Sequence, residues 1–206
     1  MSDGPTPQSF YNERIPAQFN KALDEQTELG EGGAKLLGDM NAVNATLQIV
    51  VEGDGGGTFC LNVEKGRMTS GDKAVHPPFM TLVHDLAAFE VLERESGDSA
   101  LGFLGGLAGL AGEIQLTQSR IDNLAGLNGS LRFELTGEDG FSLLAHFGSE
   151  PIPDEPNCSI SIDAEAYRQL RSGELNPQDA FMGGQIRIDG DMQMAMQLAL
   201  ALMSPD

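Results

Sequence analysis

The chain has little cysteine, little positive charge and no long apolar stretch. Its 206 residues include two cysteines, Cys60 and Cys158, which have no metal-ligand spacing and form no disulfide framework. Each lies in an apolar strand-like run, where cysteine is usually a small buried hydrophobe. No apolar stretch reaches the ~18 residues of a membrane-spanning helix, and the N-terminus has no signal-peptide pattern. We therefore expect a cytoplasmic globular protein.

Positive charge is scarce. Lys and Arg total 12 residues against 31 Asp and Glu, so the formal net charge is −19. Such a surface repels phosphate backbones, which nucleic-acid-binding proteins neutralise with Lys and Arg. It also opposes tight docking on anionic membranes. We therefore exclude nucleic-acid partners and expect the charge to serve solubility.

Recognisable catalytic and metal-binding patterns are also lacking. No serine lies in a nucleophile-elbow motif, and neither cysteine has a histidine close in sequence. His84 and Asp85 are neighbours at a predicted strand end and point in different directions, so we expect His84 to be structural. Asp189 and Asp191 lack calcium-loop spacing, and Asp191 is better explained as a helix cap. The chain is therefore predicted to have no enzyme activity, metal or cofactor.

What the chain does contain is an internal repeat. Residues 44–53 are echoed by residues 128–137, and both lead through a Gly-containing turn into a second strand pattern. Residues 78–85 are echoed by residues 156–163, and both end at an aspartate that can cap the next helix. Shorter matches continue in the same order, so the sequence predicts a duplication.

The repeat divides the chain into four segments. We predict a disordered leader (1–9), an N-terminal helical segment (10–43), a first unit (44–127) and a second unit (128–206). Each unit should contain a hairpin, a third strand, a helix, a short connection, a last strand and a closing helix; in the first unit the last strand is predicted at 112–116. Because no long linker separates the units, we expect them to pack as one body.

The closing helix of the second unit, residues 191–203, is predicted from its residue types. Met, Leu, Gln and Ala favour helix, and the segment has no β-branched residue. Gln193 and Gln197 form one narrow polar stripe, and the rest of the helix surface is apolar. Such a helix is either packed core or the wall of a space that holds another apolar molecule, a role that flexible methionines suit.

One run of the second unit has a specific order of residues. A strand at 160–163 is followed by the segment 167–177, the segment 180–191 and the apolar helix. This run, within residues 156–202, resembles the sterol carrier protein type 2 family; the match is looser in the first unit. The resemblance implies an α+β fold in which a five-stranded mixed sheet is covered by helices, here duplicated within one chain. It also implies a hydrophobic tunnel for sterols, fatty acids, acyl-CoA or phospholipids.

The resemblance further implies that the closing helix and the strands facing it line this tunnel. The candidate lining residues are Phe133, Leu135, Leu143, Ile160, Phe181, Met182, Ile186, Met192, Met196 and Leu200. Because these family members bind without chemistry, the implied function is non-catalytic lipid binding and transfer. A lipid is thus the expected partner, with transient membrane contact and a partner enzyme left open.

The first unit departs from the family pattern. Its closing helix, within residues 118–127, is polar and has no methionine. We expect the first unit to complete the second as a structural half, or its Gly-rich insert, residues 105–111, to join the tunnel wall; a packed loop is the favoured interpretation of the insert. The alternative to lipid binding is an interaction module whose apolar C-terminal helix docks a partner or a second copy.

Overall fold

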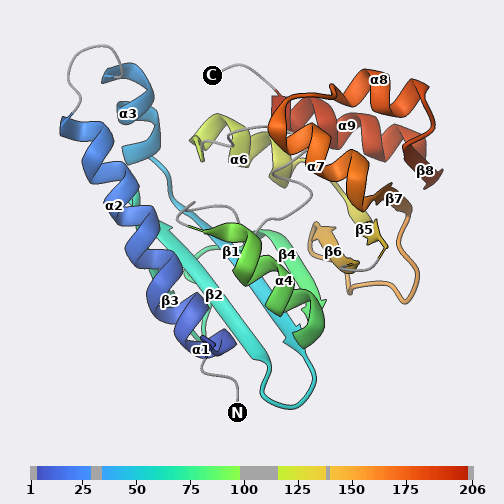
Figure 1. Ribbon diagram of the computed structural model, residues 1–206. Helices are drawn as coiled ribbons and strands as arrows, with labels where there is room; N and C mark the ends of the chain where they lie inside the picture. Colours follow the sequence, from blue (N-terminus) through green and yellow to red (C-terminus); the bar gives the residue numbers. More distant parts are fainter. Residues whose placement is uncertain (1–3, 29–33, 98–115, 138–139, 204–206) are drawn as a thin grey trace.

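The computed structural model describes residues 4–28, 34–97, 116–137 and 140–203. Its centre is one eight-stranded mixed sheet with the strand order β3-β2-β1-β4-β6-β5-β7-β8. Helices from both halves of the chain pack against this sheet (Figure 1). The predicted α+β class, with a mixed sheet covered by helices, is confirmed. Instead of the five strands implied for one unit, the two units share one larger sheet.

The first half of the sheet comes from the first unit. It contains β1 (Ala45–Glu52), β2 (Gly57–Glu64), β3 (Arg67–Gly71) and β4 (Pro78–Asp85), followed by α4 (Leu86–Ser96). β1 pairs antiparallel with β2 and parallel with β4. Four helical segments precede it: α1 (Pro7–Ser9), the π-helix η1 (Phe10–Arg14), α2 (Ile15–Glu28) and α3 (Ala34–Asn41).

The second half has the same order of hairpin, parallel strand and helix. After α6 (Gln118–Ala125), β5 (Gly129–Thr136) pairs antiparallel with β6 (Phe141–Phe147) and parallel with β7 (Cys158–Asp163). Then follow α7 (Ala164–Ser172), α8 (Pro177–Met182), β8 (Ile186–Gly190) and α9 (Met192–Met203). The shared topology agrees with the sequence repeat, while a duplication as its origin stays a prediction.

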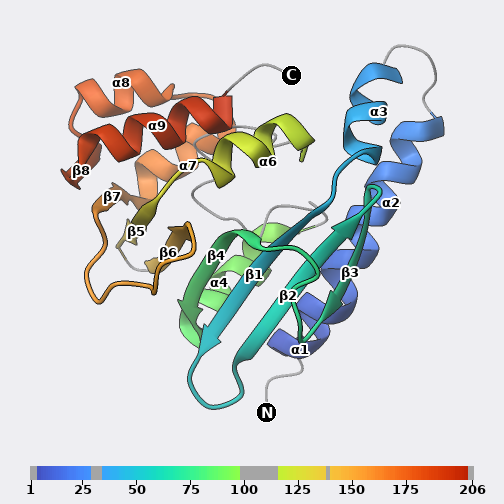
Figure 2. The same ribbon diagram turned by 180° about the vertical axis from the view of Figure 1, so that it is seen from behind.

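The two halves join through β4 and β6. These strands pair antiparallel, with Thr81 opposite His146 and Val83 opposite Leu144. The sheet therefore continues from one unit into the other (Figures 1 and 2), and helices cross the junction as well, since α4 also packs on β6 and α6 on β4. This continuity agrees with the expectation that the units pack as one body.

The sheet has one apolar and one largely polar face, because side chains alternate along each strand. Leu82, Ala145, Leu131 and Cys158 lie side by side on four adjacent strands and are all buried. The helices cover this face. Alternate positions on the other face include Thr46, Gln48, Thr81, Ser130, Arg132, Ser159 and Ser161.

Three aspartates start helices as predicted. Asp85 and Asp163 each accept a hydrogen bond from the backbone N–H three residues further on, at 2.7 Å and 2.9 Å. Asp191 accepts from the N–H groups two and three residues further on, at 2.9 Å and 3.2 Å. These bonds satisfy amides that a helix start otherwise leaves unpaired. The prediction that residues 192–203 form a helix and not a strand is also confirmed.

Two details differ from the sequence prediction. The disordered leader is wrong for residues 7–9, which form a helical turn because Thr6 and Ser9 cap each other and Pro7 favours the first helical position. Strand β3 was missed. It follows a tight turn in which Lys65 and Gly66 both have positive φ, typical of a hairpin.

Other predictions lie wholly or mostly outside the described residues. They are the insert at 105–111 and, except for residue 116, the strand at 112–116.

Candidate functional site

Half of the predicted tunnel residues lie together on the apolar sheet face of the second half. These five side chains are at most 7% exposed: Phe133, Leu135, Leu143, Ile160 and Ile186. Phe133 is beside both Leu143 and Ile160 on the adjacent strands. Their face is covered by α7 and α9, with the Tyr167 ring of α7 centred 6.4 Å from that of Phe133. The structure therefore brings the five strand candidates together.

The other five candidates, on α8 and α9, lie on a different surface. Their exposed fractions are 42% for Phe181, 79% for Met182, 49% for Met192, 60% for Met196 and 64% for Leu200. The ten predicted residues therefore line no common space in the described structure. Their role in lipid binding stays a prediction.

The side of α9 that packs against the sheet was missed. It consists of Met194, Ala195, Leu198 and Ala201, all buried. The sequence held a signal for this orientation, because the exposed Gln193 and Gln197 mark the solvent side. On a helix with 100° per residue, Ala195 and Leu198 lie opposite that stripe, whereas Met196 and Leu200 lie beside it.

A shallow pocket of about 170 Å³ opens where β5 and β7 end and β8 begins. Thr136, Ser161, Gln185 and Arg187 line it, together with the cap residue Asp163. Ser161 and Arg187 are neighbours across β7 and β8, on the polar face of the sheet. The pocket therefore suits a polar group and not an acyl chain.

In the first half, the apolar sheet face is filled by the N-terminal segment. Phe10 and Tyr11 of η1 are fully buried, and the Tyr11 ring is centred 5.3 Å from that of Phe59 on β2. Phe10 also meets Phe89 of α4 edge to face, at 5.4 Å. These aromatic side chains occupy the space between sheet and helices that a ligand would need.

The hydroxyl of Tyr11 reaches His84 on β4. Its oxygen lies 2.8 Å from Nε2, and Nδ1 lies 3.0 Å from the carbonyl oxygen of Asp85. Because a carbonyl only accepts, Nδ1 carries the proton and Nε2 accepts from the tyrosine. Burial raises the pKa of Tyr11 and is the main cause that lowers the pKa of His84, so the neutral pair is favoured. His84 is thus structural, as predicted.

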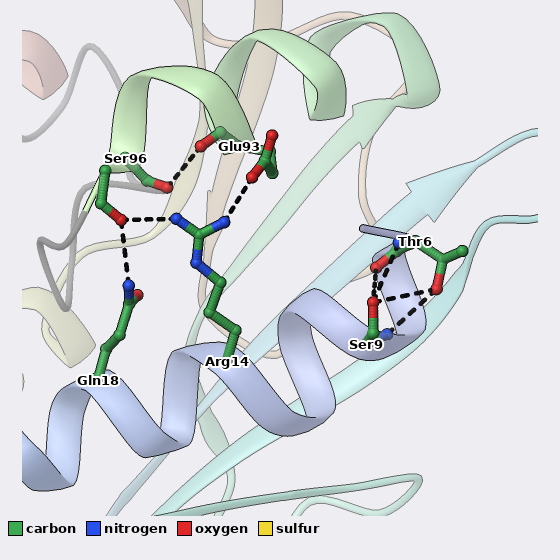
Figure 3. A network of polar contacts seen from close by, with 7 residues as sticks. Thr6, Ser9, Arg14, Gln18, Glu93 and Ser96 are labelled. Atoms are coloured by element: carbon green, nitrogen blue, oxygen red, sulfur yellow. Dashed lines mark hydrogen bonds and ion pairs between the residues drawn. The ribbon is translucent and has the colours of Figure 1, made fainter. Parts of the chain in front are cut away.

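Polar contacts hold the N-terminal helices in two places, at α4 and at the edge strand β3. Arg14 forms an ion pair with Glu93 of α4 (Figure 3) and donates a 2.7 Å hydrogen bond to the carbonyl of Gly97. At the β3 edge, the side chain of Asn20 exchanges two 2.9 Å hydrogen bonds with the backbone of Met68. The segment is therefore an integral cover of the first half.

A serine and a histidine meet in the second half. The hydroxyl of Ser130 lies 2.8 Å from Nδ1 of His146, and Nε2 donates to the carbonyl of Glu150 at 2.8 Å. Because Nε2 carries the proton of the neutral ring, Nδ1 accepts a hydrogen bond from the serine hydroxyl. Ser130 is fully buried, so the pair fastens the loop after β6 and does not present a nucleophile.

The first half has a polar pair at the matching register position. Thr46 bonds to Asn62 at 2.7 Å across β1 and β2, as Ser130 does to His146 across β5 and β6. Asn62 in turn accepts from the N–H of Val75 at 2.9 Å, in the loop before β4. Each half thus uses a buried cross-strand pair to hold the loop that leads into its parallel strand.

Two kinds of feature are absent from the described residues. No group of three or more His, Cys, Asp or Glu side chains there is arranged to hold a metal ion. In the same part of the chain, no helix combines the length and the hydropathy needed to cross a membrane.

Part of the chain is similar to known proteins. A protein of Bos taurus, Hydroxysteroid dehydrogenase-like protein 2, is 31% identical over 74 residues, covering 32% of this chain and 18% of the relative. The protein of the same name from Homo sapiens is 34% identical over the same length and coverage. The chain therefore spans less than a fifth of the length of these relatives.

Solved structures of sterol carrier proteins show a weaker likeness. Sterol Carrier Protein 2 from Yarrowia lipolytica (apo form) is 16% identical with a TM-score of 0.33, covering 50% of this chain and 92% of that chain. Sterol Carrier Protein 2 Like 2 from Aedes aegypti is 14% identical with a TM-score of 0.32, covering 54% and 94%.

The match to a family model is located by residue number. A model of the SCP-2 sterol transfer family matches residues 110–203, which include α6, all strands and helices of the second half, and both surfaces of α9. The first half of the sheet lies outside the matched range. The predicted resemblance to the sterol carrier proteins is thereby confirmed for residues 110–203.

Proposed function

We propose that the second half of this chain binds an elongated lipid, such as a sterol or a fatty acyl chain, and transfers it without chemistry. The observation that carries the proposal is the match of the SCP-2 sterol transfer family to residues 110–203. The apolar composition of α9 and of the strands beneath it supports the same assignment.

The ligand is proposed to lie between α9 and the apolar sheet face. Met194 and Leu198 of α9 are buried there, where α9 packs against β5 and β7. Met and Leu have several accessible rotamers, so an acyl chain could take the place of their packing contacts as the helix moves outward. Burial of each CH₂ group of the ligand contributes ~0.8 kcal/mol, which gives ample affinity and little head-group selectivity.

The contrast with the first half supports this placement. There the equivalent face is filled by Phe10 and Tyr11, and Tyr11 is hydrogen-bonded to His84. Opening that space would remove two buried aromatic rings and leave a buried histidine without its partner. The first half is therefore proposed to be a structural half with no ligand.

Native mass spectrometry of the purified protein tests the proposal. We expect one lipid per chain, displaced stoichiometrically by a fluorescent fatty acid. A mass without lipid, together with no uptake of added fatty acid or sterol, would refute lipid binding.

A protein-interaction module is the second candidate, and one observation favours it. Met192, Met196 and Leu200 leave an apolar stripe on the outer side of α9. If this stripe binds another protein, the chain should form a stable complex or oligomer that is lost when the stripe is made polar. Size-exclusion chromatography with light scattering over a concentration series separates this candidate from lipid binding.

An enzyme activity is not proposed. The curated relatives carry a dehydrogenase-like name, but the matched segment is 18% of their length. In the described part of this chain the one serine–histidine pair is buried.

A further inference from the structure

The outer side of α9 and the helix α8 carry most of the large apolar side chains that are exposed in the described structure. Met192, Met196 and Leu200 repeat every fourth residue, so they lie along one side of the helix. Phe181 and Met182 on α8 are exposed as well, and both helices lie at the same end of the molecule, beside β8 (Figures 1 and 2). We call these five residues the outer apolar surface. It holds five of the seven large apolar side chains that are exposed in the described structure.

The surface is uncharged on α9, although the protein as a whole is strongly acidic. Residues 192–203 contain no Asp, Glu, Lys or Arg, in a chain with a net charge of −19. The polar side chains on this helix are Gln193 and Gln197, which are neutral. An uncharged apolar partner can therefore approach α9 with no charged group on that helix to desolvate.

The size of the surface argues against a second copy of the chain as its partner. The exposed fractions of the five residues correspond to an area on the order of 500 Å², below the ~800 Å² per partner of a stable protein interface. A second copy would also bring another net charge of −19 into contact. A lipid surface needs no matching shape, and an uncharged one adds no repulsion.

The length of α9 determines how it could contact a membrane. With 12 residues, α9 is about 18 Å long and too short to cross a hydrocarbon core of ~30 Å. A short helix with an apolar stripe lies in the plane of the membrane surface with that stripe inserted. Met192, Met196 and Leu200 would then reach the acyl chains while Gln193 and Gln197 stay among the head groups.

We propose that the outer apolar surface docks the protein on uncharged, zwitterionic lipid membranes. The inference rests on the proposed function to the extent that such docking would bring the lipid site of the same half next to its source. It differs from that function in assigning a surface for the membrane itself, apart from the space for a single lipid.

Binding to phosphatidylcholine vesicles tests the proposal by flotation. The variant combines Met192→Gln, Met196→Gln and Leu200→Gln, which keep a good helix former at each position. A matched control combines Val75→Gln and Ile152→Gln, because these exposed apolar side chains lie outside α8 and α9. We expect the triple variant to bind about tenfold more weakly or worse, and the control to bind like the unmodified protein.

Charge provides a second arm of the same experiment. Adding phosphatidylserine to the vesicles should weaken binding, because the acidic protein is repelled by an anionic surface. Salt should restore that loss while leaving binding to pure phosphatidylcholine nearly unchanged. Stronger binding to anionic vesicles would contradict the proposal.

Three further outcomes would overturn it: no binding of the unmodified protein to phosphatidylcholine, equal binding by the triple variant, or an oligomer that only the triple variant loses. Uptake of a fluorescent fatty acid without vesicles keeps the two proposals apart. If uptake fails in the unmodified protein while vesicle binding persists, the docking surface stands and the lipid site does not.

Discussion

The two halves of the sheet have the same strand topology and different covers. In the first half, buried aromatic rings from η1 fill the apolar face, and polar contacts fasten that cover at both edges. In the second half, α7 covers part of the face with the ring of Tyr167, and α9 covers part of it with methionine, leucine and alanine and keeps a second apolar stripe towards solvent. The comparison indicates that the same strand topology can be covered by an aromatic N-terminal segment in one half and, in the other half, partly by the flexible side chains of α9.

The largest expected effect comes from removing a buried aromatic ring from the first half. Tyr11→Ala should lower the free energy of unfolding by about 3–5 kcal/mol, as other large aromatic truncations in cores do, and should also orphan His84. Denaturant unfolding should still show one transition, because β4 and β6 join the halves. Phe181→Ala, at an exposed aromatic, is the control and should cost about 1 kcal/mol or less. Two separate transitions would break the picture of one body.

The proposed lipid site in the second half is tested by filling the space between α9 and the sheet with a larger side chain. Leu198→Trp should reduce fatty-acid uptake about tenfold or more, because a larger side chain occupies the space proposed for the ligand. Gln197→Trp, on the exposed side of the same helix, is the matched control and should leave uptake intact. Circular dichroism establishes that both variants are folded. Equal uptake by both would move the ligand away from the inner side of α9.

The free energy of unfolding should depend on pH because of His84, which is buried in the first half. Burial lowers the pKa of His84 in the folded protein below its ordinary value near 6.5. The unfolded chain therefore binds a proton more readily, and stability that is complete above about pH 6.5 is lost as the pH falls below it, by up to ~1.4 kcal/mol per unit. Unfolding free energies between pH 7.5 and 5.5 measure this slope. His84→Gln should flatten it, and an unchanged slope would assign it to other groups.

The smallest effects should be equal in the two halves. Asp85→Ala and Asp163→Ala each remove the cap of the helix that follows the parallel strand, and each should cost about 1 kcal/mol of unfolding free energy. Chemical denaturation of the two variants measures both values. If one variant loses more than twice the unfolding free energy that the other loses, the two caps do not contribute equally despite the shared topology.

Much of the framework could be predicted from local sequence signals. The hairpins, the third strand of each half and the caps Asp85, Asp163 and Asp191 follow from alternation and from residues that start helices. The joining of β4 to β6 could not be predicted, because pairing between distant strands leaves no local mark. β3 was missed since its five residues are largely polar at an edge.

The site was predicted less well than the fold. The strand candidates that the resemblance implied, such as Phe133 and Ile160, lie on one buried face of the sheet. On α9 the chosen residues lie on the solvent side, because a helix that is apolar nearly all round gives only a weak direction signal through Gln193 and Gln197. The role of Tyr11 depends on the distant His84 and had no signal in the sequence alone.

The central claim is that the second half holds the lipid and the first half does not. Photo-crosslinking with a diazirine-bearing fatty acid, followed by peptide mapping, tests it without any substitution. The account predicts one crosslinked lipid per chain, on peptides from β5 to β8 and α9. Crosslinks on β1, β2 or η1 at similar yield, or none above background, would contradict it.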